Sequence, residues 1–99
     1  MKSENFELEL GYISDGTLRT MVKDFFEIRC PEYFWSVPAS STGKFHPEIS
    51  LGEGGLVRHT KAVVMIAEEM LHLSMWSGLL PIKDEIIASC LIHDTFKLG

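Results

Sequence analysis

Cysteine is scarce in this sequence. Only Cys30 and Cys90 occur, and they do not form a Cys-x-x-Cys pair. A disulfide framework needs several paired cysteines, and a cysteine-based zinc site needs closely spaced ones. The sequence supports neither, so we expect two buried free thiols.

Positive charge is also scarce, because nine Lys and Arg residues stand against 14 Asp and Glu residues and the net charge is -5. Nucleic-acid binding over a broad surface depends on dense Lys and Arg that neutralise phosphates. The charge balance argues against such a surface. The charge balance does not exclude a local basic pocket.

Long hydrophobic runs are missing as well. The two longest, 62–67 and the Ser-interrupted 86–92, are far shorter than the roughly 20 residues of a membrane-spanning helix. The opening MKSENFELEL carries charges where a signal peptide has its apolar core. We therefore expect a soluble, cytoplasmic protein that does not contact a membrane.

The residues that are present predict a mainly α fold. With 45% apolar and 23% charged residues in 99 positions, the chain has the composition of one globular domain, 1–99. Residues 5–10 alternate polar and apolar, which predicts a short extended segment within an N-terminal arm, 1–14. Helical spacing then predicts helices over about 16–30, with Ser14 or Asp15 as cap, and over about 55–75 and 81–99. The intervening 32–55 has no period and is typical of a lid or binding loop.

Two histidines are predicted to meet where the last two helices end. The connection around Gly78 is only about five residues long, which favours antiparallel neighbours. His59 lies 19 positions before Gly78 and His93 lies 15 after it. At 1.5 Å per residue the two differ by only about 6 Å in height along the helix pair. Each histidine shares a helical stripe with other residues: Leu56, Val63, Ile66, Met70 and Leu73 for His59; Ile82, Ile86, Ser89, Cys90 and Lys97 for His93.

The residue types at this point are typical of a metal site. His59, His93 and the adjacent Asp94 offer two imidazoles and a carboxylate, a set that suits Mn, Fe, Ni or Zn. A divalent metal lowers the pKa of water and polarises a phosphoryl group. Cations near these residues in sequence can neutralise phosphate charge; they are Lys44, Arg58, Lys61 and Lys97.

These motifs resemble a known family. "GGLVRHT", a long helix and "CLIHDTFK" are similar to the start of an HD-domain phosphohydrolase, whose name comes from its His-Asp doublet. The resemblance covers about residues 20–99 and implies a partial HD-domain helical bundle. It implies His59, His93 and Asp94 as ligands of a divalent metal (Mn, Ni, Fe, Mg or Zn). It also implies Asp94 and Lys97 as catalytic residues, with Lys97 contacting the substrate phosphate.

The segment "FFEIRCPEYFWSVPASSTGKFHP" is similar to the HD domain of 3′→5′ exoribonucleases, in which a PAS-like segment and a His precede the "GGL" motif. The expected substrate is then a phosphate-containing small molecule or an RNA end. We expect Arg58, Lys44 and His46 to contribute to its binding. For His46, the alternative is a solvated loop histidine.

Two departures from the family pattern matter. Thr95 and Phe96 stand where a Gly-containing turn usually follows the doublet. The family also supplies a further Asp ligand from a later helix, whereas this sequence stops at Gly99. We therefore expect an HD domain truncated after its doublet, with an uncovered apolar face that forms a homo-oligomer.

Other interpretations remain open. In one alternative, the chain is a non-catalytic HD-like module for binding or oligomerisation. In another it is a helical interaction domain whose histidines meet by coincidence. A single histidine such as His59 on an apolar face is commonly a core residue. Lys97 alone would be a favourable cation near a helix C-terminus.

Overall fold

The computed structural model describes residues 2–38 and 52–96, and all regular structure within these ranges is helical. The predicted mainly α fold is thus confirmed. Lys44, His46 and Lys97 lie outside the described residues. In the part that is described, no single helix is long and apolar enough to cross a membrane; one pair, Gly55–Leu71 with Ser74–Ile92, reaches the length and composition together but is bent by 113°.

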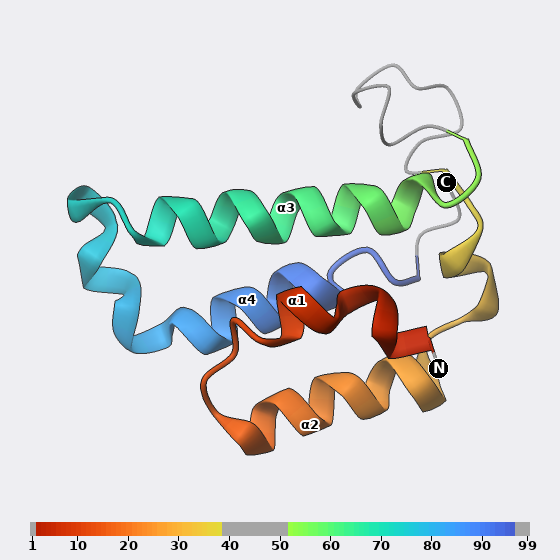
Figure 1. Cartoon of the computed structure of the whole chain (residues 1–99), viewed down its shortest axis with the longest axis horizontal. Coiled ribbons are helices and arrows are strands. Elements are labelled where there is room, and N and C mark those ends of the chain that lie inside the picture. Colours follow the sequence, from red (N-terminus) through yellow and green to blue (C-terminus); the bar gives the residue numbers. More distant parts are fainter. Residues whose placement is uncertain (1, 39–51, 97–99) are drawn as a thin grey trace.

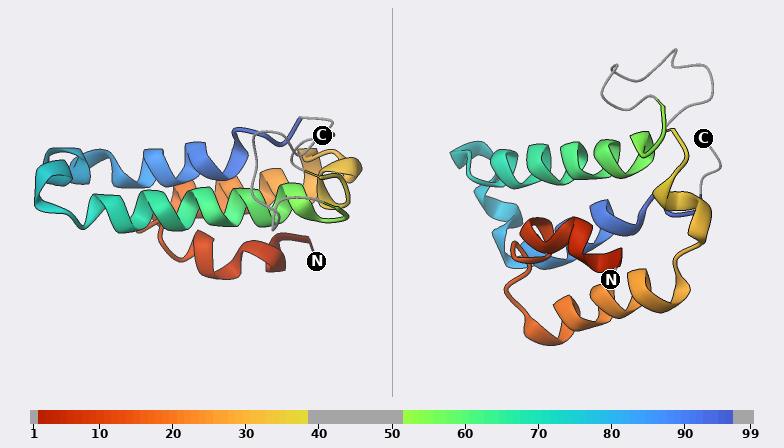
Figure 2. Two further views of the ribbon diagram at one scale, coloured as in Figure 1. Left: turned by 90° about the horizontal axis from the view of Figure 1, so that it is seen from above. Right: turned by 45° about the vertical axis from the view of Figure 1, so that its right-hand side comes forward.

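Within the described residues, four α-helices form a small bundle (Figure 1). In that view α3 and α2 lie on opposite sides, with α1 and α4 between them; Figure 2 shows α1 and α4 on opposite faces of α3. Helices α3 and α4 run antiparallel and share the most extensive packing. The bounds are α1 (Glu7–Leu10), α2 (Gly16–Asp24), α3 (Gly55–Leu71) and α4 (Lys83–Ile92).

The predicted extended segment at 5–10 is wrong. Residues Lys2–Phe6 form a 3-10 helix that continues directly into α1. Phe6 and Leu10 are buried, whereas Leu8 between them is 62% exposed. Burial therefore follows the i, i+4 spacing of a helix rather than the alternation of a strand.

Helix α2 begins as predicted, because the carboxylate of Asp15 accepts hydrogen bonds from the backbone N–H groups of Thr17 and Leu18. It continues as a π-helical segment, Phe25–Arg29. A further 3-10 helix, Glu32–Trp35, anchors the start of the long connection to α3.

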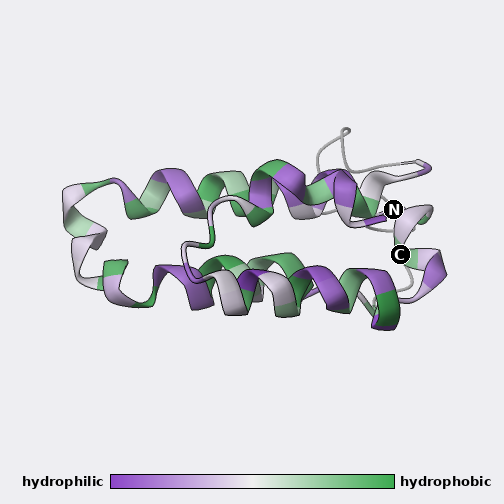
Figure 3. Ribbon diagram, turned by 60° about the horizontal axis from the view of Figure 1, so that its bottom comes forward, coloured by the Kyte–Doolittle hydropathy of each residue, from purple (hydrophilic) through white to green (hydrophobic). Residues whose placement is uncertain are grey.

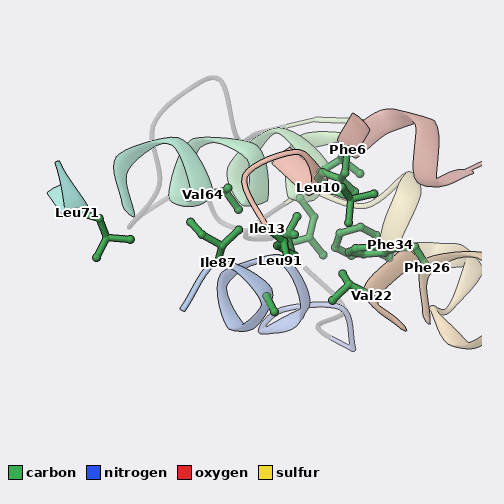
Figure 4. Packing of buried hydrophobic residues seen from close by; sticks show 13 residues of the cluster. Phe6, Leu10, Ile13, Val22, Phe26, Phe34, Val64, Leu71, Ile87 and Leu91 are labelled. Atoms are coloured by element: carbon green, nitrogen blue, oxygen red, sulfur yellow. The ribbon is translucent and has the colours of Figure 1, made fainter. Parts of the chain in front are cut away.

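An aromatic cluster forms one end of the core (Figure 4). Phe6, Phe26 and Phe34 are essentially fully buried, and the ring centroids of Phe6 and Phe26 lie 4.8 Å apart. The ring of Trp35 lies 5.9 Å from that of Phe6. These contacts join the N-terminal segment, the π-helical segment Phe25–Arg29 and the 3-10 helix Glu32–Trp35.

The last two helices are shorter than predicted. Helix α3 ends at Leu71, and the α3–α4 connection is the 3-10 helical Ser74–Ile82 rather than a five-residue loop. Hydrophobic and hydrophilic residues alternate along the helices (Figure 3), but the buried face of α3 differs from the predicted stripe. Its buried side chains include Leu56, Thr60, Val64 and Leu71, while Ile66, Met70 and Leu73 are exposed.

Asp84, in the first turn of α4, fastens this helix to the loop between α1 and α2. Its carboxylate accepts hydrogen bonds from the backbone N–H groups of Ser14 (2.9 Å) and Asp15 (2.8 Å). The bond from Ser14 is the main cause that lowers the pKa of Asp84. A carboxyl group whose pKa is lowered on folding stabilises the folded state above its unfolded pKa and loses this effect as the pH falls.

We therefore expect Asp84→Asn to reduce the free energy of unfolding by about 1 kcal/mol at neutral pH, a modest value because water screens a group near the surface. Below about pH 4, where aspartate takes up its proton, the difference between wild type and variant should shrink. Urea unfolding of wild type and variant at neutral pH and below about pH 4 measures this difference in the free energy of unfolding. A difference that is independent of pH would contradict the assignment.

Candidate metal centre

Three side chains that can bind a metal converge where α3 begins and α4 ends. His59 lies in the second turn of α3, His93 follows the last residue of α4, and Asp94 comes next in the turn 93–96. Because α3 and α4 run antiparallel side by side, the first turns of one lie beside the last turn of the other (Figure 1). The ring centroids of the two histidines are 6.1 Å apart.

Asp94 lies between the two imidazoles. Its Oδ2 atom is 3.5 Å from Nε2 of His59 and 3.0 Å from Nε2 of His93. One ligand atom from each of the three residues lies within 4.8 Å of the others. Two ligand atoms bound to one ion at about 2.1 Å are about 3.4 Å apart in a tetrahedral site and at most about 4.2 Å apart, so the side chains have to close in by roughly half to one and a half ångströms to bind one ion together.

A hydrogen bond orients the imidazole of His93. Its Nδ1 atom lies 2.6 Å from the carbonyl oxygen of Cys90. A carbonyl oxygen can only accept, so Nδ1 carries a proton, and in the neutral ring Nε2 then holds the lone pair. Backbone carbonyls commonly fix the tautomer of metal-binding histidines in this way. In the neutral ring, Nε2 is thus a ready donor atom on the side of Asp94.

Local hydrogen bonds and contacts from another part of the chain hold the turn that contains Asp94. Thr95 is 1% exposed, and both its backbone N–H and its hydroxyl donate to the carbonyl of Ile92. The hydroxyl of Tyr33 donates to the carbonyl of Phe96 at 2.9 Å, and the Phe96 ring packs edge-on against Phe25. Thr95 and Phe96, the residues that depart from the family pattern, are therefore both anchored here.

The three candidate ligands are accessible from solvent. Their side chains are 18% (His59), 38% (His93) and 22% (Asp94) exposed, so an ion can reach them without a change of fold. The two cysteines are half-buried, whereas buried thiols were expected. Burial raises the pKa of Cys30 to about 11 and also raises that of Cys90, so both stay protonated at neutral pH and are poor metal ligands.

Two of the predicted phosphate-binding cations, Arg58 and Lys61, lie in the described part of the chain, and both line a pocket that does not include the three candidate ligands. Arg58 precedes His59 and therefore points about 100° around the helix from it. With Lys61 and Trp35 it lines a different surface pocket. Lys61 is also paired with the buried Glu9 at 3.0 Å. Roles for Arg58, Lys44, His46 and Lys97 in substrate binding remain predictions.

Comparisons of the chain with protein-family models, with curated proteins and with solved structures found no match. The interpretation of the site therefore depends on its residues, their geometry and the sequence motifs that contain them.

Proposed function

We propose that the chain is an HD-type domain that binds one divalent metal ion through His59, His93 and Asp94 and hydrolyses a phosphate ester or diester of a nucleotide or RNA. The observation that carries this proposal is the convergence of the three ligand atoms within 4.8 Å. The resemblance of "GGLVRHT" and "CLIHDTFK" to HD domains supports the same ligands and the phosphate chemistry.

The donor set suits an ion that acts on an anionic substrate. The two histidines are neutral donors and Asp94 contributes one negative charge, so the three residues leave a net positive charge on a divalent ion. Three protein ligands also leave coordination positions free, as catalytic sites do. When bound, such an ion lowers the pKa of water and polarises a phosphoryl oxygen. The protein's own part is to orient His93 through Cys90 and to hold Asp94 through the anchored turn.

Lys97 is the residue that we propose for the substrate phosphate, because it follows the doublet by three positions in the motif. A second cation, from Lys44 or Arg58, would neutralise further charge. His46 is proposed as an additional contact. These assignments depend on the motif, since three of the four residues lie outside the described ranges.

The rival function is a non-catalytic module. His59 and His93, when protonated, would form ion pairs with Asp94 at the observed separations without any metal. The large exposed apolar side chains of α3 and of the α3–α4 connection also favour a binding role. Metal-dependent hydrolysis distinguishes the two functions.

Hydrolysis of p-nitrophenyl phosphate and of bis-p-nitrophenyl phosphate, with Mn²⁺ or Ni²⁺ and with a chelator, tests the proposal. We expect the wild type to be active only with metal and Asp94→Asn to lose activity by more than about a hundredfold. Asp24→Asn makes the same chemical change on the exposed surface of α2 and should keep full activity. Activity in the presence of chelator, or in Asp94→Asn, would contradict the assignment; an inactive wild type would favour the module.

A further inference from the structure

The α3–α4 connection and the adjoining end of α3 expose large apolar side chains. The α3–α4 connection has no buried residue among its nine positions, and residues 73–82 contain no charged side chain. Ile66 and Met70 on α3, with Leu73 just after it, form an exposed stripe at i, i+4 and i+7 that continues into this connection. We define the apolar face by its eight exposed side chains, which are Ile66, Met70, Leu73, Met75, Trp76, Leu79, Leu80 and Ile82.

We propose that this apolar face is the interface of a two-fold symmetric dimer of the chain. Its side chains are between 37% and 77% exposed. Large side chains present roughly 200 Å² each when fully exposed, so eight that are about half exposed offer at most on the order of 800 Å². This is about the area that each partner buries in a standard protein–protein interface. A two-fold contact uses the same face twice and closes the assembly.

Charge favours a second copy as the occupant. The chain carries a net charge of -5, so two copies that meet through charged faces repel each other, whereas residues 73–82, which supply six of the eight side chains of the apolar face, bring no charges together. Its edge is polar and of mixed sign, because His72 and Lys83 lie 3.7 Å and 3.9 Å from carboxylate oxygens of Glu68. An apolar centre with a polar rim is the usual anatomy of an interface. Segments that lie on lipid surfaces are instead rich in Lys and Arg, which residues 73–82 lack.

The dimer is compatible with the candidate metal centre and does not depend on it. The α3–α4 connection lies at the end of the α3–α4 pair opposite to the first turns of α3 and the last turn of α4 (Figure 1). A second copy docked on the connection therefore leaves His59, His93 and Asp94 open to solvent. Loss of metal binding would not alter the predicted dimer, and loss of the dimer would not remove the ligands.

Sedimentation velocity of the metal-free chain, from low to high micromolar concentration, tests the dimer. The monomer mass is 11.2 kDa, and we expect a transition to twice this mass. Met75→Glu and, separately, Leu80→Glu place like charges across the two-fold contact, which should weaken association by more than about a hundredfold. Both side chains are exposed, so the monomer fold should tolerate the change.

Ile28→Glu is the matched control, because Ile28 is 74% exposed but lies on the π-helical segment, outside the apolar face. It should leave the dimer intact, and circular dichroism should show equal helix content in all variants. A wild type that stays monomeric throughout, a dimer that survives both Met75→Glu and Leu80→Glu, or an open-ended polymer would overturn the proposal. A monomer that cosediments with phosphatidylcholine vesicles would assign the face to lipid instead.

Discussion

Replacing His93 with Ala is expected to abolish the thermal stabilisation that Mn²⁺ or Ni²⁺ gives to the protein. An ion that binds only the folded state at about a hundred times its Kd adds roughly 2.7 kcal/mol to the free energy of unfolding. For a domain of this size that corresponds to a rise in melting temperature of roughly 10–20 °C. Removing one of three ligands should weaken binding so far that almost none of this rise remains.

His72→Ala is the matched control for this experiment. His72 follows the C-terminus of α3, and its side chain is 70% exposed. The same chemical change there should leave the metal-induced rise in melting temperature as in the wild type. If the two histidine variants respond equally to metal, binding does not involve His93 and the proposed centre is wrong.

Phe6→Ala is expected to cause the largest loss of stability, about 3–5 kcal/mol, because a large buried aromatic side chain is replaced by a cavity. Phe6 is fully buried and contacts the rings of Phe26, Phe34 and Trp35. The ammonium group of Lys61 also lies over its ring, 5.4 Å from the centroid. For a single domain of marginal stability, a loss of this size approaches complete unfolding.

Leu8→Ala provides the comparison, since Leu8 is in the same segment but 62% exposed. It should change the free energy of unfolding by less than about 0.5 kcal/mol. Urea denaturation followed by circular dichroism measures both variants. Equal, small effects of the two substitutions would mean that the N-terminal segment is an arm outside the core, as the alternating sequence pattern alone suggested.

The sequence was informative where a pattern is long and local chemistry is specific. The helical spacing over 16–30 and 55–75 predicted helices that exist, and Asp15 caps α2 through the expected side-chain bonds. The prediction of an extended segment at residues 5–10 was wrong because the apolar residues there fit both a strand and a helix. Only the burial of Phe6 and Leu10 distinguishes the two structures. The inward face of α3 was missed because Thr60 and Ala67 lie on it, and neither is a strong hydrophobic signal.

The candidate ligands could be found from the sequence because two antiparallel helices bring together positions that lie at similar distances along the chain from their connection. The connection was not the predicted loop, since Gly78 and Pro81 are compatible with a 3-10 helix, yet the pairing of α3 with α4 survived this error. The support of the site could not be predicted. The hydrogen bond from Tyr33 to Phe96 joins residues 63 positions apart, and no local pattern reports such a contact.

The central claim is that His59, His93 and Asp94 together hold one divalent ion. Isothermal titration calorimetry of the 99-residue chain with Mn²⁺ and Ni²⁺ tests it most directly. We predict a single binding event with one ion per chain, lost in His93→Ala and retained in His72→Ala. Absence of binding to the folded wild type, or unchanged binding in His93→Ala, would contradict it.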